Sequence, residues 1–184
     1  EDSTTKIPKS TQQMIYYPTN KIRVPVNKEN VLKSGVVKPE DAELIVDYID
    51  INLPKSGLYK NRLMMLDILH NNDWERPIYF TGGSYDDSEY FWMKDYLQLD
   101  GLVYKLVPIK TPLDPNNPYQ MGRIDANRMF DIVMGWGWGN SDSPDIYHDP
   151  ETRKNSISFR SNITRLANAL IEEKEVEKAI TVLD

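Results

Sequence analysis

The chain has no cysteine and only two histidines, His70 and His148. The absence of cysteine excludes disulfide bonds, thiolate metal ligands and a cysteine nucleophile. Two histidines cannot form a multi-histidine metal centre within one chain. We therefore expect neither a metal ion nor another cofactor.

Long apolar segments are also missing. A helix that crosses a bilayer needs roughly 18 or more predominantly apolar residues. The longest stretch without a formal charge covers residues 10–20 and is mostly polar. The chain shows no signal-peptide pattern, and it begins at Glu1 rather than at methionine. We therefore expect it to be part of a longer protein.

The residues that are present are typical of a globular protein with a sizeable core. Of the 184 residues, 40% are hydrophobic and 27% are charged. The 22 Lys and Arg residues are outnumbered by 28 Asp and Glu residues, which gives a net charge of −6. Because nucleic-acid binding needs a basic surface that neutralises phosphates, this balance argues against a nucleic-acid partner.

Short β-prone segments alternate with helical segments along most of the chain. We expect strands at residues 14–17, 22–26, 45–53, 76–81 and 102–109, and helices at residues 28–34, 58–71, 87–97 and 125–134. This alternation is typical of βαβ units, so we predict an α/β fold with a small, mainly parallel sheet over residues 14–148. The polar residues 1–13 are expected to form a flexible leader.

Residues 76–81 are predicted to form an internal strand of that sheet. Pro77 stands near the start of the strand, where a missing N–H group is tolerated, and the apolar run that follows it is continuous. We expect the core to contain Ile78, Phe80, Val103 and Leu106.

The last part of the chain, residues 149–184, is predicted to form a helical hairpin. Its helices cover residues 151–173 and 176–183. Apolar and small residues fall where a tetratricopeptide repeat places its packing residues; these are Ile163, Leu166, Ala167, Leu170, Ala179 and Leu183. We expect Ala179 and Leu183 to face the first helix. The hairpin is either the start of a tetratricopeptide-like array or a generic cap on the α/β domain.

Two sets of residues suggest catalysis or anion binding. Residues 81–84, Thr-Gly-Gly-Ser, lie between a predicted strand and a predicted helix, where backbone N–H groups can hold an anion. They lack the Gly-Lys-Ser/Thr of a P-loop, and the adjacent Asp86 and Asp87 repel phosphate, so an ordinary turn is favoured. Asp86, Asp87 and Asp95 are also candidates for the carboxylate pair of a glycoside hydrolase. Adjacent Asp residues at a helix start are more often caps.

Acidic residues and one histidine gather after residue 141. Oxygen ligands of this kind suit a hard divalent cation; the residues are Asp142, Asp145, His148 and Asp149. Their order does not match an EF-hand loop, and the sequence Asp-Pro-Glu at residues 149–151 is also typical of a helix start. We favour the helix start and expect no metal.

Two tryptophans stand between glycines in the sequence Gly-Trp-Gly-Trp-Gly at residues 135–139. If exposed, Trp136 and Trp138 can stack on a sugar or a peptide, with Asp145, Tyr147 and His148 beside them. Alternatively, the two rings form a plug over the core, since Trp buries a large area and finds a partner for its N–H group. The plug is favoured, but any ligand is expected to bind at these five residues.

Several segments together resemble a known family. They are residues 17–26 (YPTNKIRVPV), 58–72 (LYKN onwards), 74–80 (WERPIYF), 96–108 (YLQLDGLVYKLVP), 122–125 (GRID) and 143–150 (SPDIYHDP). In this order they resemble the soluble C-terminal region of a bacterial multi-pass membrane protein family that is similar to protein O-mannosyltransferases and other polytopic glycosyltransferases.

The resemblance implies a parent protein with many transmembrane helices before this region. In such transferases the catalytic acid lies in a loop beside the first membrane helices, and the donor is a lipid-linked sugar. No catalytic residue therefore carries over to this chain. The resemblance also implies an extracytoplasmic, periplasmic location near the membrane, with the parent's own membrane domain as partner.

Two functions follow as expectations. In the first, the chain is an accessory domain that positions an acceptor protein or glycan for the membrane glycosyltransferase, and is not itself an enzyme. In the second, it is a structural or protein-interaction module with no role in sugar transfer. An independent hydrolase is a third and weaker alternative.

Overall fold

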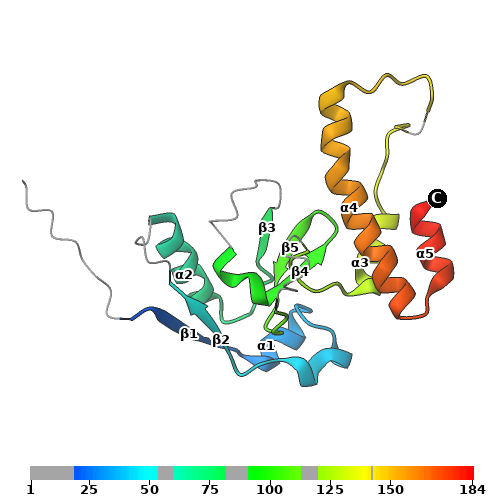
Figure 1. The fold of residues 1–184 in the computed structure, drawn as a ribbon. Helices are drawn as coiled ribbons and strands as arrows, with labels where there is room; N and C mark the ends of the chain where they lie inside the picture. Colours follow the sequence, from blue (N-terminus) through cyan, green and yellow to red (C-terminus); the bar gives the residue numbers. More distant parts are fainter. Residues whose placement is uncertain (1–18, 54–59, 82–90, 113–119, 142) are drawn as a thin grey trace, which may run out of the picture.

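The computed structural model describes residues 19–53, 60–81, 91–112, 120–141 and 143–184, with the side chains of residues 91 and 92 left out. Two small sheets and three C-terminal helices make up most of the fold (Figure 1). The predicted leader, the strand at residues 14–17, and the candidate residues 82–84, Asp86 and Asp87 lie outside the described residues. Among the described helices, none is long and apolar enough to cross a membrane.

The first sheet pairs β1 (Lys21–Pro25) with β2 (Tyr48–Asn52) in antiparallel register. Strand side chains alternate between two faces, so Ile49 and Ile51 both point into the core, where they are fully buried. Helix α1 (Lys28–Lys33) follows β1 directly. The helix is followed by Gly35, whose φ of +67° allows the Val36 N–H group to bond back to the Val31 carbonyl at 3.1 Å.

The second sheet contains β3 (Tyr79–Thr81), β4 (Leu97–Asp100) and β5 (Val103–Leu106) in the order β3-β5-β4. Both strand pairs are antiparallel. Helix α2 (Lys60–Asn72) precedes β3, and a 3₁₀ helix, η3 (Phe91–Tyr96), precedes β4. Another 3₁₀ helix, η1 (Pro39–Leu44), lies between the first sheet's strands in sequence.

The prediction of a mainly parallel βαβ sheet was wrong. The named strands pair only in antiparallel fashion in the described part of the chain, apart from an isolated parallel bridge between Gln98 and Arg123. Residue 97 was predicted to end a helix and residues 98–100 were assigned to no strand, but residues 97–100 form β4 and return through Gly101 into β5. A connection of two residues can join antiparallel strands only, because parallel strands need a long crossover.

The predicted position of β3 was also wrong, because it is an edge strand of its sheet. Phe80 on this edge strand and Ile78 just before it are only half-buried. On the central strand β5, Val103 is also half-buried, whereas Leu106 is buried as predicted. An edge strand has a neighbour on one side only, so the continuous apolar run did not indicate a central strand.

The C-terminal helices are α3 (Ala126–Met134), α4 (Pro150–Glu172) and α5 (Val176–Leu183). Asp125 and Asp149 cap α3 and α4 through their side chains. Ala179 packs with Leu166 and Leu170 as predicted. Leu183, however, is 61% exposed, and Val182 takes the buried position instead.

Two hydrophobic clusters hold these parts together. One lies between the two sheets and α1, and includes Ile49, Ile51, Leu97 and Leu106. The other joins α3, α4 and α5 to Leu99 of β4. Strand β4 therefore contributes Leu97 to one cluster and Leu99 to the other, which places the β4–β5 hairpin between the N-terminal half and the helices (Figure 1).

Candidate functional site

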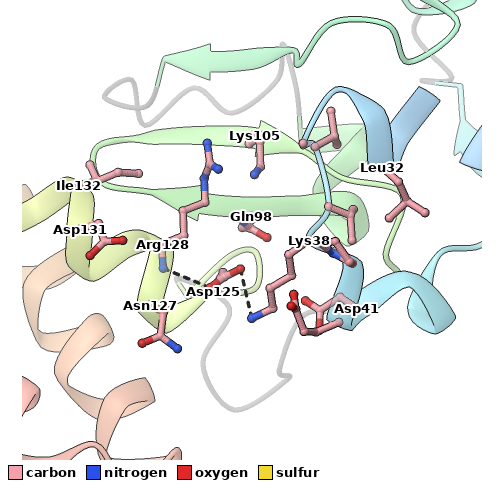
Figure 2. Close-up of a pocket in the computed structure, with 15 residues that line it drawn as sticks. Leu32, Lys38, Asp41, Gln98, Lys105, Asp125, Asn127, Arg128, Asp131 and Ile132 are labelled. Carbon is pink, nitrogen blue, oxygen red and sulfur yellow. Dashed lines mark hydrogen bonds and ion pairs between the residues drawn. The ribbon is translucent and has the colours of Figure 1, made fainter. Parts of the chain in front are cut away.

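A cleft of about 830 Å³ opens between the segment after α1, the β4–β5 hairpin and the first turn of α3 (Figure 2). Apolar side chains form part of its walls; these are Leu32, Val36, Val37, Pro39 and Ile132. Polar side chains from both the hairpin and α3 reach into it; these are Gln98, Lys105, Asp125, Asn127 and Arg128. The cleft therefore combines apolar walls with a charged floor.

The hairpin register explains how polar groups reach the floor. Gln98 and Asp100 are two residues apart on β4 and so share one face of the sheet. Lys105 on β5 pairs directly with Gln98 and therefore lies on the same face. Leu97 and Leu99 occupy the opposite face, where they pack in the two hydrophobic clusters.

A buried charge network is centred on Asp100. Its Oδ2 atom lies 2.9 Å from Arg128 Nε and 3.4 Å from Lys105 Nζ, and its Oδ1 atom accepts a hydrogen bond of 2.8 Å from Gln98 Nε2. The side chains of Asp100 and Lys105 are each 2% exposed. Buried charges are tolerated only when paired and hydrogen-bonded, and here two cations share one carboxylate.

Their surroundings shift the pKa values of Lys105 and Arg128 in opposite directions. Burial lowers the pKa of Lys105, and the negative charge of Asp100 offsets this only in part. Burial also acts to lower the pKa of Arg128, but the hydrogen bond and the charge of Asp100 outweigh it, so this pKa is raised. Arg128 also donates a hydrogen bond of 3.3 Å to the Tyr79 hydroxyl of β3.

A second ion pair stands beside this network. Lys38 Nζ lies 3.4 Å from Asp125 Oδ2, while Asp125 Oδ1 accepts from the Arg128 backbone N–H group at 3.2 Å (Figure 2). At the rim, Asp41 Oδ2 is paired with Arg123 Nη2 at 2.6 Å. The carboxylates of Asp41, Asp100 and Asp125 are thus each neutralised by a cation.

The aromatic residues predicted from the sequence lie away from this cleft and form a cluster of their own. Trp136 and Trp138 meet edge to face with centroids 5.5 Å apart, and both contact Phe159 of α4, at 5.6 and 5.9 Å. Trp136 is half-buried, whereas Trp138 is 48% exposed. Trp136 therefore matches the predicted plug more closely, whereas Trp138 exposes part of its ring to solvent.

The other predicted ligand contacts lie in the same segment. Tyr147 is 81% exposed. Asp145 is exposed, and its backbone N–H group donates to the Ser143 hydroxyl at 3.3 Å. His148 Nε2 lies 3.0 Å from the Ser141 carbonyl oxygen. The segment thus places polar groups near exposed aromatic rings, and a binding role for them stays a prediction.

The acidic residues after 141 do not gather as metal ligands in the described part of the chain. Asp149 instead accepts the Thr152 N–H group at 2.9 Å, and this bond holds the pKa of Asp149 below its usual value. Asp142 lies outside the described residues. Asp95 is half-buried, and its carbonyl accepts from the Thr111 N–H group; its predicted carboxylate partners are outside the described residues.

Sequence reasoning did not identify the residues of the cleft. Lys105 stands in an otherwise apolar strand, and this lone charge was the one available signal, because a lysine is rarely buried without a partner. Arg128 and Lys38 gave no such signal, since each belongs to a segment with an ordinary polar pattern. Their convergence depends on the hairpin and on α3.

Comparison with known proteins supports the resemblance to an O-mannosyltransferase-like membrane protein, but not its bacterial origin. The family model described as TMEM260-associated domain 2 matches residues 1–128, and TMEM260 is an O-mannosyltransferase-like membrane protein. Searches of curated proteins and of solved structures found no significant match. The matched segment contains every charged residue of the cleft floor and ends before the aromatic segment. Because the match covers more than half of the chain, the protein belongs to the TMEM260-associated domain 2 family.

Proposed function

We propose that this accessory domain of a TMEM260-like protein positions an acceptor for sugar transfer, and that the acceptor binds in the cleft. The observation that carries the proposal is the cleft itself, in which a rigidly paired charge network lies beneath an opening bounded by apolar walls. Such a lining can bind a polypeptide or a glycan, since both present polar groups between apolar surfaces.

The arrangement favours binding over catalysis. A general acid or base needs a titratable group that is free to exchange its proton with the substrate. Asp41, Asp100 and Asp125 are each held by a cation at 2.6–3.4 Å. The two other carboxylates that line the cleft, Glu40 and Asp131, are exposed rather than buried. We therefore assign sugar transfer to the membrane part of the parent protein and expect none from this chain alone.

The domain's proposed place is on the extracytoplasmic side of the membrane, beside the parent's own membrane domain. This location rests on the family's association with TMEM260, an O-mannosyltransferase-like membrane protein. An acceptor held there would be presented to the transferase at the membrane surface.

A second contact is proposed at the aromatic segment. Trp138 and Tyr147 expose ring surface, while Trp136 and Phe159 hold Trp138 in place. Rings held in this way stack on sugar faces or peptide groups at little cost in side-chain entropy. Ile146 and Ile157 are exposed apolar residues of the same part of the chain.

The cleft assignment is tested by blocking its entrance. Glu40 lines the cleft, whereas Glu43 on the same η1 helix does not, and both are exposed. Binding of a fluorescently labelled unfolded polypeptide and of a labelled mannose oligosaccharide is measured by anisotropy. We expect Glu40→Trp to abolish binding of at least one ligand and Glu43→Trp to preserve it. Equal binding by both variants would overturn the assignment.

The alternative function is that of a protein-interaction module. It is favoured by an apolar surface at the C-terminal end, which consists of the exposed side chains Ile171, Val176, Ile180 and Leu183. A further helical repeat of the tetratricopeptide kind would cover such a surface. If Ile180→Glu abolishes polypeptide binding and Glu40→Trp does not, this alternative holds.

A further inference from the structure

The cleft floor carries more positive than negative charge. Lys105 and Arg128 share the single carboxylate of Asp100, and Lys38 is paired with Asp125. The floor therefore holds three cations and two anions. The other acidic residues of the cleft lie outside this group: Asp41 is paired with Arg123, and Glu40 and Asp131 are exposed. The surplus lies in a partly buried place, where charge is screened less than at the surface.

Two of the three cations are accessible from the cleft. The side chains of Arg128 and Lys38 are 43% and 36% exposed, and both line the cleft. Lys105 lies beneath them with almost no exposed surface. A ligand would therefore contact Arg128 and Lys38 directly, while Lys105 adds its charge from below.

From this arrangement we propose that the cleft binds the carboxylate of an acidic side chain in an extended polypeptide. A single carboxylate would balance the surplus charge, and the planar Arg128 guanidinium is suited to carboxylates. The short aliphatic stem of Glu or Asp would pass between the apolar walls formed by Leu32, Val36 and Ile132. The proposal rests on the proposed function, in which the acceptor occupies the cleft.

Other anions and sugars fit less well. Glu40 and Asp131 line the cleft at exposed positions. They repel any anion, but they would repel a doubly charged phosphate or another polyanion more strongly than a single carboxylate, and the net charge of −6 adds to this difference. Among the described residues that line the cleft there is no aromatic ring on which a sugar would stack. A side chain with a single negative charge and an apolar stem avoids the stronger repulsion of a polyanion and needs no aromatic ring for stacking.

The test is an NMR titration of the ¹⁵N-labelled full 184-residue chain with a matched pair of ligands. N-acetyl-glutamate amide carries the carboxylate, and N-acetyl-glutamine amide is its neutral counterpart of nearly the same shape. We expect the glutamate ligand to bind in the millimolar range and to shift the amide signals of residues 36–41 and 125–128. The glutamine ligand should bind at least tenfold more weakly. Equal binding of the two ligands would overturn the proposal.

Variants then identify the cations. Arg128→Gln and Lys38→Gln should each weaken binding of the glutamate ligand at least fivefold, while Lys154→Gln on the exposed face of α4 should leave it unchanged. The ¹⁵N spectrum of each variant shows whether the fold is kept. Unchanged binding in both folded cleft variants would refute the assignment, as would tighter binding of inorganic phosphate than of the glutamate ligand.

A further titration separates this inference from the proposed function. A labelled polypeptide without acidic residues is titrated against the wild-type chain and Glu40→Trp. If this polypeptide and its acidic counterpart bind the wild type equally tightly, and Glu40→Trp abolishes both interactions, the carboxylate site is overturned. The proposed acceptor role would then still hold. Tighter binding of the acidic counterpart would support the carboxylate site.

Discussion

Arg128 of α3 reaches the buried Asp100 of β4, with Nε and Oδ2 2.9 Å apart. This ion pair joins the first turn of a helix to the end of a hairpin. Its Arg128 side chain lines the cleft (Figure 2). Because Asp100 is almost inaccessible to water, its charge depends on Arg128 and Lys105 for compensation.

Removing the carboxylate should therefore destabilise the fold. Asp100→Asn leaves Lys105 buried beside a second cation, and we expect the free energy of unfolding to fall by about 3–5 kcal/mol. Urea denaturation measures the loss. In the Asp100→Asn background, Lys105→Met should recover part of it, because the buried positive charge is then gone. A loss below about 1 kcal/mol would contradict the buried network.

The hairpin turn requires glycine at residue 101. Its φ is +68°, and an added Cβ would lie 3.0 Å from Ile132 Cγ2 and from Trp136 Cζ2. Gly101→Ala should lower stability by about 1–3 kcal/mol. Gly137→Ala is the matched control, since a Cβ there has no described atom within 4 Å. Equal melting temperatures of the two variants would contradict this geometry.

The α4–α5 hairpin offers a matched pair of leucines. Leu166 is fully buried in the second cluster, whereas Leu183 is mostly exposed. Leu166→Ala should cost about 2–5 kcal/mol, and Leu183→Ala should change stability by less than about 0.5 kcal/mol. Chemical denaturation compares them. Similar losses would mean that Leu183 packs as first predicted.

Acid should weaken the first sheet through Asp50. Hydrogen bonds from Arg23 and Lys21 hold the pKa of Asp50 well below its usual value. A pKa that is lower in the folded than in the unfolded state gives stability above the unfolded value, near 4, which is lost as the pH falls towards the folded value. Urea unfolding between pH 7 and pH 2.5 should therefore show a smaller acid loss for Asp50→Asn than for the wild type. An equal loss would exclude this contribution.

The aromatic segment is tested by tryptophan fluorescence. If Trp138 stacks on a glycan or an unfolded peptide, titration to millimolar ligand should shift the emission, and Trp138→Ala should remove the shift. Trp74→Phe should retain it, because Trp74 is buried and donates its indole N–H group to the Pro25 carbonyl. Absence of any shift in the wild type would leave the two rings with a packing role alone.

Local sequence patterns were sufficient for the positions of α1, α2 and α3 and for the two C-terminal helices, but not for the segment before β4, where a 3₁₀ helix ends at Tyr96 and residue 97 already belongs to the strand. Asp125 and Asp149 cap the helices that follow them, and Gly35 follows the end of α1 with a positive φ. These features depend on residues within three or four positions of one another, so they are set by local hydrogen bonds and local backbone freedom. The resemblance to an O-mannosyltransferase-like membrane protein family was likewise visible in the sequence, whereas the bacterial origin inferred with it is not shown by the family match.

Strand direction and the cleft were decided by the tertiary structure. The same alternation of short segments is compatible with parallel or antiparallel pairing, and the choice followed from the short return at Gly101. In the cleft floor, Lys38 pairs with Asp125 and Asp100 pairs with Arg128, and the partners in each pair are far apart in the sequence. The sequence alone determined the local elements, because their interactions lie close along the chain. The charged floor arose only when packing of the hairpin against α3 brought distant, individually ordinary residues into one buried place, where their charges had to be paired.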